Sequence, residues 1–326
     1  MPCHPKKPEF QVRDIPSLRG YIAIVTGGNS GIGYEITLQL ALRGARVYIA
    51  SRSSDRVNKA IAEMRQNSPD LDLHFLKLDL QDLQSIKVTA ADFMSREYRL
   101  DILINNAGIM ASPFKLTKDG FELQWQTCFL SHHALTMELM PLLISAAQES
   151  GRMDRSRIVN VASDMALRMG PESINYDDPN LTDLTGTLAP WKRYGHCKEA
   201  NIIAARAITD RYQSLGVTAY SVHPGIVKSG LQSHNPSKIF GAVSKIAMTV
   251  GPTSTTLEAA LNSLFCATSG RAFANPGRYY VPVTKLDDRA NKWLDDPRAV
   301  NKLWDLATKQ LKEHGFVVGN SPQYYN

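Results

Sequence analysis

The sequence predicts a doubly wound α/β protein, in which a parallel sheet is covered by helices on both faces. Along most of the 326 residues, short β-branched segments alternate with segments whose apolar residues recur at helical spacing. A glycine-rich stretch, TGGNSGIG, joins the first of these strands to the first helix. Such alternation is typical of parallel sheets, because the crossover between two parallel strands is usually a helix.

The predicted elements follow one another from residue 21. Residues 21–27 (YIAIVTG) form a buried strand, and the next helix carries Ile32, Ile36 and Leu40 on one face and ends at Gly44. A second strand over 45–51 precedes a helix over 54–66. The remaining predicted strands, with helical patterns between them, are 71–80, 101–108, 156–163 and 216–225.

The chain is predicted to form a single domain, because no repeat, low-complexity tract or linker interrupts this alternation. Residues 1–19 are polar and proline-rich and are interpreted as an N-terminal arm. The domain then spans 20–326 and includes a charged helical extension at about 284–315.

Composition excludes several classes of protein. Hydrophobic residues make up 43% and charged residues 21% of the chain, as in ordinary globular proteins. The net charge of +6 comes from scattered Lys and Arg, whereas a nucleic-acid surface needs that charge on one face. We therefore expect no nucleic-acid partner and favour anionic small molecules.

The cysteines and the apolar runs predict a cytoplasmic protein. The four cysteines are widely spaced without a CxxC pair, which argues against a disulfide framework or a zinc site. No apolar run approaches the ~20 residues that cross a bilayer. His132 and His133 lack metal-ligand spacing with acids, so we interpret both as helix-packing residues and predict no metal.

The stretch TGGNSGIG predicts a phosphate-binding loop. Gly27, Gly31 and Gly33 allow a tight turn and let a diphosphate approach the free N–H groups at the start of the helix. The spacing is GxxxGxG and differs from the usual GxGxxG. Its position between the first strand and the first helix favours a dinucleotide cofactor.

The residues at the end of the second predicted strand indicate which dinucleotide cofactor binds. An acid there binds the adenosine ribose hydroxyls of NAD, whereas an arginine suits the 2′-phosphate of NADP. This chain has Ser51 and Arg52, with no acid before Asp55. We therefore predict NADP(H), with an exposed residue at a helix start as the alternative interpretation of Arg52.

The segment YGHCK places Tyr194 and Lys198 one helical turn apart. A neighbouring ammonium lowers a tyrosine pKa from its usual ~10, which would make the phenol an acid or base near neutral pH. A solvated helix face with an aromatic residue beside a lysine is the alternative.

With TGGNSGIG, NNAG and YGHCK in this order, the chain resembles the short-chain dehydrogenase/reductase family over about residues 20–240. The segments SPFKLTKDGFELQ, YGHCKEAN and HPGIV resemble the branch that contains retinol dehydrogenases and WW-domain oxidoreductases. GRYYVPVTK and the charged helix after it resemble fungal biosynthetic members of that branch. The resemblance implies a Rossmann-type fold.

The resemblance also implies roles for individual residues. Tyr194 matches the catalytic acid/base, Lys198 the lysine that lowers its pKa and holds the nicotinamide ribose, and Ser163 the serine that binds the substrate oxygen. The implied cofactor-binding residues are Gly27, Ser30, Gly31, Ile32 and Gly33 in the phosphate loop, Asp79 at the adenine, Asn105, Ala107 and Gly108 along the cofactor, and Pro224, Gly225, Ile226, Val227 and Ser229 beside the carboxamide.

Cys128 departs from the family pattern. The family usually has an asparagine here, which orders a water between the catalytic lysine and solvent, and a thiol is a weaker donor and acceptor. Two interpretations stay open: another group orders the water, or the chemistry has changed. Cys197 is interpreted as a small helix residue that could lie near Cys128, with a disulfide or a reactive thiol as the less favoured alternative in a reducing compartment. Trp125 and Phe129 are interpreted as core residues.

The leading hypothesis is an NADP(H)-dependent oxidoreductase that moves hydride between nicotinamide and a carbonyl or secondary alcohol. Segments 164–193 and 228–250 should face the substrate, and their apolar residues favour a bulky, apolar secondary metabolite: Met165, Leu167, Met169, Leu231, Ile239 and Phe240. The rival hypotheses are an isomerase, lyase or cyclase in the same pocket, and a regulator that senses NADPH. Family members often pair through helices matching 124–146 and 194–213, so a homodimer is a further expectation.

Overall fold

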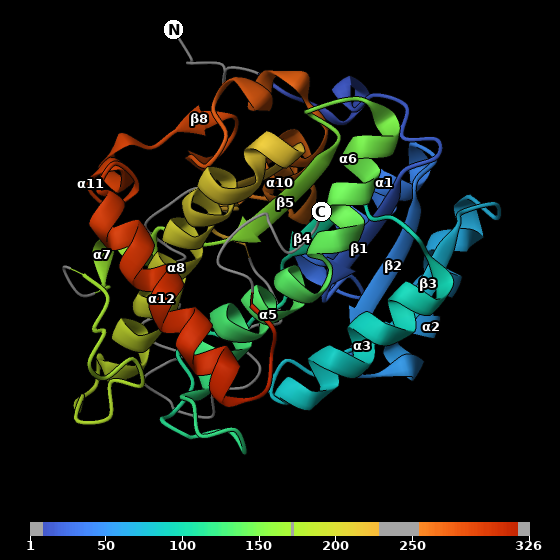
Figure 1. The fold of residues 1–326 in the computed structure, drawn as a ribbon. Coiled ribbons are helices and arrows are strands. Elements are labelled where there is room, and N and C mark those ends of the chain that lie inside the picture. The colour runs from blue at the N-terminus through green and yellow to red at the C-terminus, as the bar shows by residue number, and fades with distance from the viewer. Residues whose placement is uncertain (1–8, 171–172, 228–253, 319–326) are drawn as a thin grey trace, which may run out of the picture.

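A single eight-stranded sheet forms the centre of the molecule (Figure 1). The computed structural model describes residues 9–170, 173–227 and 254–318. In the order β3-β2-β1-β4-β5-β6-β7-β8, all neighbouring strands are parallel except β7 and β8. The strands are β1 (Ile22–Thr26), β2 (Arg46–Ser51), β3 (Leu73–Lys77), β4 (Ile102–Asn105), β5 (Ser156–Val161), β6 (Val217–Val222), β7 (Tyr279–Val281) and β8 (Lys285–Leu286). The predicted doubly wound fold is confirmed.

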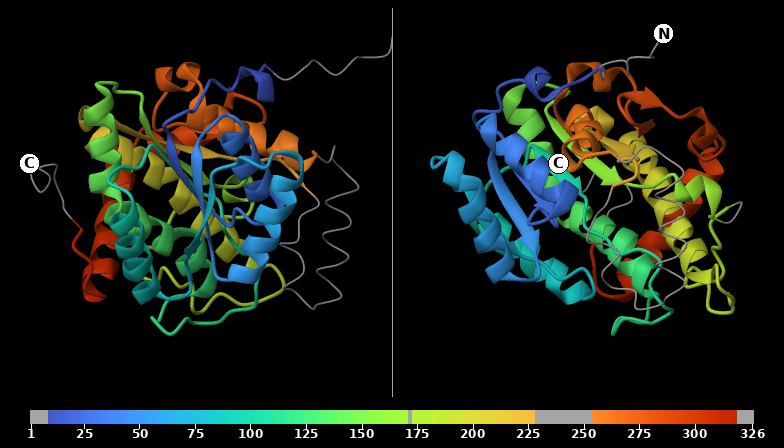
Figure 2. Two further views of the ribbon diagram at one scale, coloured as in Figure 1. Left: turned by 90° about the vertical axis from the view of Figure 1, so that its right-hand side faces the viewer. Right: turned by 180° about the vertical axis from the view of Figure 1, so that it is seen from behind.

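Helices cover both faces of this sheet (Figure 2). One hydrophobic cluster joins the sheet to α1 (Gly31–Leu42), α2 (Ser54–Asn67) and α10 (Thr256–Thr268). The other joins it to α3 (Leu83–Arg96), α5 (Ser131–Glu138), α6 (Met140–Ser150), α8 (Ala189–Tyr212) and α12 (Pro297–Glu313). Alternate residues of β1 point into different clusters, Ile24 into one and Val25 into the other, which explains why this strand is apolar throughout.

Three predicted strands end three residues earlier than expected. β3 ends at Lys77, β4 at Asn105 and β6 at Val222, whereas the predicted strands ran to residues 80, 108 and 225. The chain leaves the sheet after β4 because the Thr26 hydroxyl accepts the Asn106 and Ala107 N–H groups, each at 2.9 Å. β3 and β4 therefore end where a cleft begins.

The predicted N-terminal arm and C-terminal extension both pack against the rest of the domain. Phe10, Ile15 and Leu18 are buried against the cluster of α1 and α10, and the Phe10 and Phe265 ring centroids are 5.4 Å apart. The C-terminal part begins with β8, followed by the short helices η6 (Asp288–Ala290) and α11 (Asn291–Leu294), before α12. No helix in the described ranges is long and apolar enough to cross a lipid bilayer.

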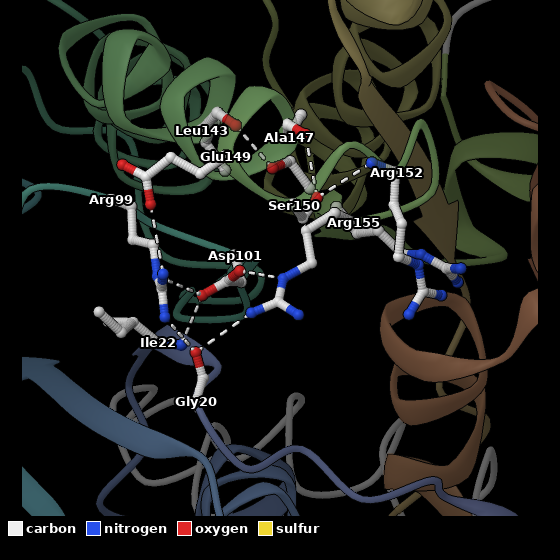
Figure 3. A network of polar contacts seen from close by, with 12 residues as sticks. Gly20, Ile22, Arg99, Asp101, Leu143, Ala147, Glu149, Ser150, Arg152 and Arg155 are labelled. Carbon is white, nitrogen blue, oxygen red and sulfur yellow. Dashed lines mark hydrogen bonds and ion pairs between the residues drawn. The ribbon is translucent and has the colours of Figure 1, made fainter.

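A buried carboxylate joins the amino ends of three central strands (Figure 3). Asp101, just before β4, accepts the Ile22 N–H at 2.7 Å and a very short hydrogen bond from Arg155, just before β5. Arg99 and Arg155 also donate to the Gly20 carbonyl, at 2.6 and 3.1 Å. This network fixes the edge of the sheet that lies opposite the cleft described next.

Candidate active site

A cleft opens where β1, β2 and β4 end, on both sides of the point at which the strand order reverses. Its volume is about 670 Å³. In doubly wound folds this position is the usual binding site for ligands. Of the residues predicted to bind the cofactor, the cleft is lined by Gly27, Ser30, Gly31, Ile32, Gly33, Arg52, Asp79, Ala107 and Gly108.

The glycine-rich loop is shaped to admit a phosphate group. Gly27 and Gly31 have φ angles of +66° and +56°, a region that other residues rarely adopt. A Cβ on Gly33 would lie 2.4 Å from the Gly27 carbonyl oxygen, so only glycine fits there. Ser30 precedes α1 without capping it by its side chain, which leaves the first N–H groups of the helix free for an anion. These features fit a dinucleotide diphosphate.

Two guanidinium groups lie at the far end of this cleft. Arg52 follows β2, and Arg56 lies in the first turn of α2; both are exposed and line the cleft. Within the described residues neither forms an ion pair with a carboxylate. Sequence reasoning missed Arg56, although its position one turn after Arg52 is visible in SRSSDR. Two unpaired cations at one site favour an anionic ligand group.

Of the two asparagines in NNAG, the second lines the cleft. The Asn105 amide was predicted to lie along the cofactor, but it is buried and donates to Asn160 at 2.9 Å and Thr136 at 3.1 Å. Asn106 lines the cleft and donates to the Thr26 carbonyl at 2.9 Å. Asn105 therefore joins β4 to β5 and supports the cleft from below.

Ser163, Tyr194 and Lys198 lie together just beyond the end of the cleft. The Ser163 hydroxyl lies close enough to the Tyr194 phenol to lower its pKa, and it accepts the Met165 N–H at 3.2 Å. Lys198 Nζ lies 5.6 Å from the centroid of the Tyr194 ring and donates to the Val161 carbonyl at 2.7 Å. A Cβ on Gly108, which lines the cleft, would lie 3.7 Å from Lys198 Nζ. The structure thus brings these three predicted residues together beside the cleft.

Burial controls the protonation of the Tyr194 phenol. The side chain is 8% exposed, and this desolvation raises its pKa to about 12, against the opposing effects of the Lys198 ammonium and the Ser163 hydrogen bond. The lowered pKa predicted from the sequence is therefore wrong for the protein as it stands. Burial disfavours the Lys198 ammonium, but the electrostatic influence of Tyr194, Cys128 and Cys197 raises its pKa overall. At neutral pH Tyr194 is an acid beside a cation.

Cys128 lies in the short π-helix η2 (Gln126–Leu130) and is held by the backbone of Ile109. Its sulfur accepts the Ile109 N–H at 3.4 Å and contacts the Ile109 carbonyl at 3.3 Å. Its own carbonyl accepts the Asn201 amide at 3.0 Å. The thiol therefore makes well-defined contacts with the loop after NNAG, so its presence does not by itself require altered chemistry.

The two histidines after Cys128 pack inside the helical layer, as predicted. His132 Nε2 lies 2.9 Å from the Thr26 hydroxyl, and the His133 ring packs against Trp304 with centroids 5.2 Å apart. Burial lowers the pKa of His132 to about 3 and that of His133 to about 4, so both are neutral. Trp125 and Phe129 are buried in the core, as predicted. No cluster of potential metal ligands occurs in the part of the chain that the structure describes.

The predicted substrate side is described only in part. Met165, Leu167 and Met169 are half-buried in and after α7 (Met165–Arg168), directly after Ser163. Pro224, Gly225, Ile226 and Val227 follow β6, and Val227 bridges to Ser254. The other predicted residues lie outside the described residues: Ser229, Leu231, Ile239 and Phe240, with the segment 228–250.

Comparison with known proteins agrees with this geometry. Residues 21–177 match the family described as short chain dehydrogenase. The Aspergillus calidoustus short-chain dehydrogenase/reductase drtF is 36% identical over 308 residues, which cover 92% of this chain and 96% of that protein. Homo sapiens retinol dehydrogenase 12 is 34% identical over 310 residues, covering 90% of this chain and 87% of that protein.

A solved structure shows the same fold at lower identity. The NADPH-bound carbonyl reductase from chicken fatty liver superposes with a TM-score of 0.60 at 23% identity, over 84% of this chain and 96% of that one. The fold, the order of the motifs and the full-length relatives agree with one another. The chain is therefore a member of the short-chain dehydrogenase/reductase family, enzymes that interconvert alcohols and carbonyls with a nicotinamide cofactor, on the branch that contains retinol dehydrogenases and fungal relatives.

Proposed function

We propose that this enzyme uses NADPH to reduce a carbonyl group on a bulky, mostly apolar substrate. The observation that supports the cofactor is the pair Arg52 and Arg56 on the cleft wall. A 2′-phosphate can accept hydrogen bonds from both guanidinium groups, and no carboxylate in the described residues competes for either. The ribose hydroxyls of NADH would leave both cations unpaired.

The residues beside the cleft have the protonation states that a reduction needs. When bound, NADPH would supply the hydride that adds to the carbonyl carbon. Tyr194 holds a proton on its phenol oxygen and donates it to the oxygen of the substrate as negative charge develops there. The Ser163 hydroxyl, which lies beside the same phenol, stabilises that charge. Lys198 stays protonated and keeps a positive charge beside Tyr194 as it loses its proton.

The surroundings of these groups support an apolar substrate. Met165 and Leu167 follow Ser163 and pack partly into the core cluster of this face. Phe114, whose ring centroid lies 4.5 Å from the Arg193 guanidinium next to Tyr194, and Leu188, just before α8, are exposed large apolar side chains. An apolar, half-buried lining with few polar groups is typical of sites for lipophilic small molecules, and we extend this to a secondary metabolite.

Binding measurements with both cofactors test the cofactor assignment. The protein should bind NADPH at least about tenfold more tightly than NADH, which corresponds to only ~1.4 kcal/mol. Arg52→Ala and Arg56→Ala should each weaken NADPH binding and leave NADH binding nearly unchanged, because only the 2′-phosphate loses a partner. Lys59→Ala, an exposed cation on the same helix that does not line the cleft, is the matched control. Equal affinity for the two cofactors in the unmodified protein would refute the assignment.

A further inference from the structure

A closed ring of hydrogen bonds lies beneath the cleft. Its members are buried residues from five elements: Asn105 on β4, Cys128 on η2, His132 and Thr136 on α5, Asn160 on β5 and Asn201 on α8. The Asn105 amide donates in two directions, to Asn160 at 2.9 Å and to the Thr136 hydroxyl at 3.1 Å. On one side Thr136 donates to the His132 carbonyl at 2.7 Å. On the other side the Asn160 amide donates to the Asn201 carbonyl at 3.4 Å.

The His132 imidazole closes this ring and connects it to the cleft. Its Nδ1 lies 3.2 Å from the Cys128 carbonyl oxygen, which also accepts the Asn201 amide at 3.0 Å. Its Nε2 lies 2.9 Å from the Thr26 hydroxyl. That hydroxyl accepts the N–H groups of residues 106 and 107, and both residues line the cleft. One buried ring therefore bridges the loop after β4 and helix α8.

The hydrogen bonds of Thr26 determine which nitrogen of His132 carries the proton. A hydroxyl oxygen has two lone pairs, and in Thr26 both accept backbone N–H groups at 2.9 Å. Its single proton is donated, and His132 Nε2 at 2.9 Å is closer than the Ile104 carbonyl at 3.3 Å. Nε2 is therefore an acceptor, and the proton lies on Nδ1 and points at the Cys128 carbonyl. Burial, which lowers the pKa of His132 to about 3, keeps the imidazole neutral.

The two segments that this imidazole bridges meet at Lys198. Asn201 lies three residues after Lys198 on α8. On the other side Gly108 directly follows the two residues held by Thr26, and a Cβ on Gly108 would lie 3.7 Å from Lys198 Nζ. The distance between the cleft loop and the catalytic helix is thus fixed by contacts that pass through His132.

We propose that neutral His132 is a positioning residue that holds the cofactor-binding loop after β4 in register with the catalytic helix α8. The proposal rests on the function proposed above, which assigns the loop to the cofactor and α8 to proton transfer. His132 does not line the cleft, so it acts through Thr26 and the Cys128 carbonyl. Because a displacement of about 1 Å in an active site can cost on the order of 10²-fold in rate, loss of the imidazole should affect the site more than the fold.

His132→Phe tests this role with little disturbance of the fold. The variant keeps a planar ring but lacks both nitrogens. No new buried group loses its last partner, because Thr26 can donate to the Ile104 carbonyl and the Cys128 carbonyl still accepts Asn201. We expect the melting temperature to stay close to that of the parent, while the Kd for NADPH, measured by its fluorescence, rises about three- to tenfold. His132→Gln should restore part of the affinity, because its amide oxygen can accept the Thr26 proton.

The neighbouring histidine provides a matched control. His133 is also buried on α5, but neither of its nitrogens has a hydrogen-bond partner among the described residues. His133→Phe should therefore bind NADPH like the parent. Weaker binding of equal size in both phenylalanine variants, or parent-like binding in folded His132→Phe, would overturn the proposal.

Nitrogen-15 NMR of the full-length, histidine-labelled protein reads the tautomer independently of activity. The signals that disappear in His132→Phe should show a proton on Nδ1 and none on Nε2; if that variant does not fold, His132→Gln gives the assignment and the binding comparison. A proton on Nε2 would overturn the proposal. Titration with NADH separates this result from the cofactor assignment. Equal affinity for NADH in the parent would contradict NADPH preference, and the effect of His132→Phe would then be measured on NADH.

Discussion

The protonated Tyr194 phenol favours carbonyl reduction over alcohol oxidation at neutral pH. A buried phenol with a pKa of about 12 is protonated throughout the neutral range. Reduction consumes that proton and requires the acid form, which is lost only as pH approaches this pKa. Oxidation requires the phenolate, whose population grows about tenfold for each pH unit below the pKa. We therefore predict that carbonyl reduction is independent of pH between about 6 and 9, whereas alcohol oxidation rises steadily.

Steady-state rates in both directions across this pH range would check the prediction. Tyr194→Phe should lower turnover by about 10² or more and remove the pH dependence of oxidation, while NADPH binding stays nearly intact. A reductive rate that falls above about pH 7 would show that the phenol ionises much more readily than its burial implies. Product formed without oxidation of NADPH would instead favour the non-redox rival.

Glu199 is a buried acid that the mechanism does not use. It follows Lys198 on α8, and burial raises its pKa to about 8. Neither oxygen has a well-formed hydrogen bond among the described residues, although the Ile174 amide and the exposed Lys292 weakly favour the anion. Because the folded state holds this proton more tightly than the unfolded chain, stability is greatest below the unfolded pKa of 4.5 and falls as pH rises toward 8.

Glu199→Gln should remove this loss of stability. We expect the free energy of unfolding of the parent, relative to the variant, to fall by about 3 kcal/mol between pH 5 and pH 8. Urea denaturation at several pH values measures the difference. Glu313→Gln, an exposed acid at the end of α12, should give no such difference. Parallel stability curves for Glu199→Gln and the parent would mean that Glu199 is ionised in the folded state.

Some of these residues could be identified from the sequence, whereas other properties of the site depend on how the chain folds. Ser163, Tyr194 and Lys198 could be assigned from spacing and family resemblance, because motif positions are local. The raised pKa of Tyr194 could not, since it follows from burial by segments distant in the chain. Arg56 and Asn106 were missed for the same reason. Whether a residue beside a motif points into the cleft depends on how its element packs.

At the scale of elements, an ion pair connects the C-terminal segment to the turn that carries Ser163. Asp164 follows Ser163, and its carboxylate accepts from Arg289 on η6 at 2.8 Å and, very closely, from Arg168 on α7. The Asp164 N–H contacts His223, which precedes the predicted carboxamide loop, at 3.3 Å. Arg289 thus holds the turn that carries Ser163 from outside the central sheet.

Arg289→Ala should therefore affect catalysis more than stability. Arg289 is exposed, although its partners Asp164 and Asp287 are largely buried, so its removal should cost about 1 kcal/mol of stability and lower the melting temperature only slightly. Turnover should fall about three- to tenfold, because the Ser163 turn gains freedom, and Arg289→Lys should restore part of it. Arg298→Ala, which removes an exposed arginine paired with Asp296, is the matched control. Unchanged turnover in Arg289→Ala would assign the contact to the surface alone.

Most elements were predictable, and the discrepancies have two causes. β1, β2, β5 and β6 are recognisable because each contains buried apolar and β-branched residues. The predicted ends of β3, β4 and β6 were each three residues too late; after Lys77 and Asn105 the chain turns away from the sheet to line the cleft, which the local sequence does not reveal. The pairing of β7 with β8 was not predicted, because strands of three and two residues carry too little pattern.

At the scale of the whole molecule, removing the charge of Asp101 should lower the free energy of unfolding more than removing the charge of an exposed acid. It is fully buried and contacts Arg155, Arg99 and the Ile22 amide (Figure 3). Asp101→Asn keeps the shape of the side chain but leaves the Arg155 cation without its partner. Breaking a buried ion pair typically costs about 3–5 kcal/mol. We predict a loss of about this size in the free energy of unfolding from urea titration.

An exposed ion pair on α8 provides the control for Asp101→Asn. Asp210→Asn removes the partner of Arg206 on the surface of α8 and should cost less than about 1 kcal/mol. Both variants should retain the parent's affinity for NADPH at low temperature, because neither residue lies near the cleft. A small effect of Asp101→Asn, equal to that of Asp210→Asn, would place the stability of the sheet in its apolar layers alone.

The position of Asp101 also has an evolutionary consequence. It joins strands at the end of the sheet opposite Ser163 and the glycine-rich loop, so the anchoring contacts and the reacting groups do not share residues. Mutations that broaden or redirect substrate choice can accumulate in the loops of one edge while selection for folding acts on the other. A lineage that inherits this separation can diversify its chemistry without first acquiring compensating changes in its scaffold.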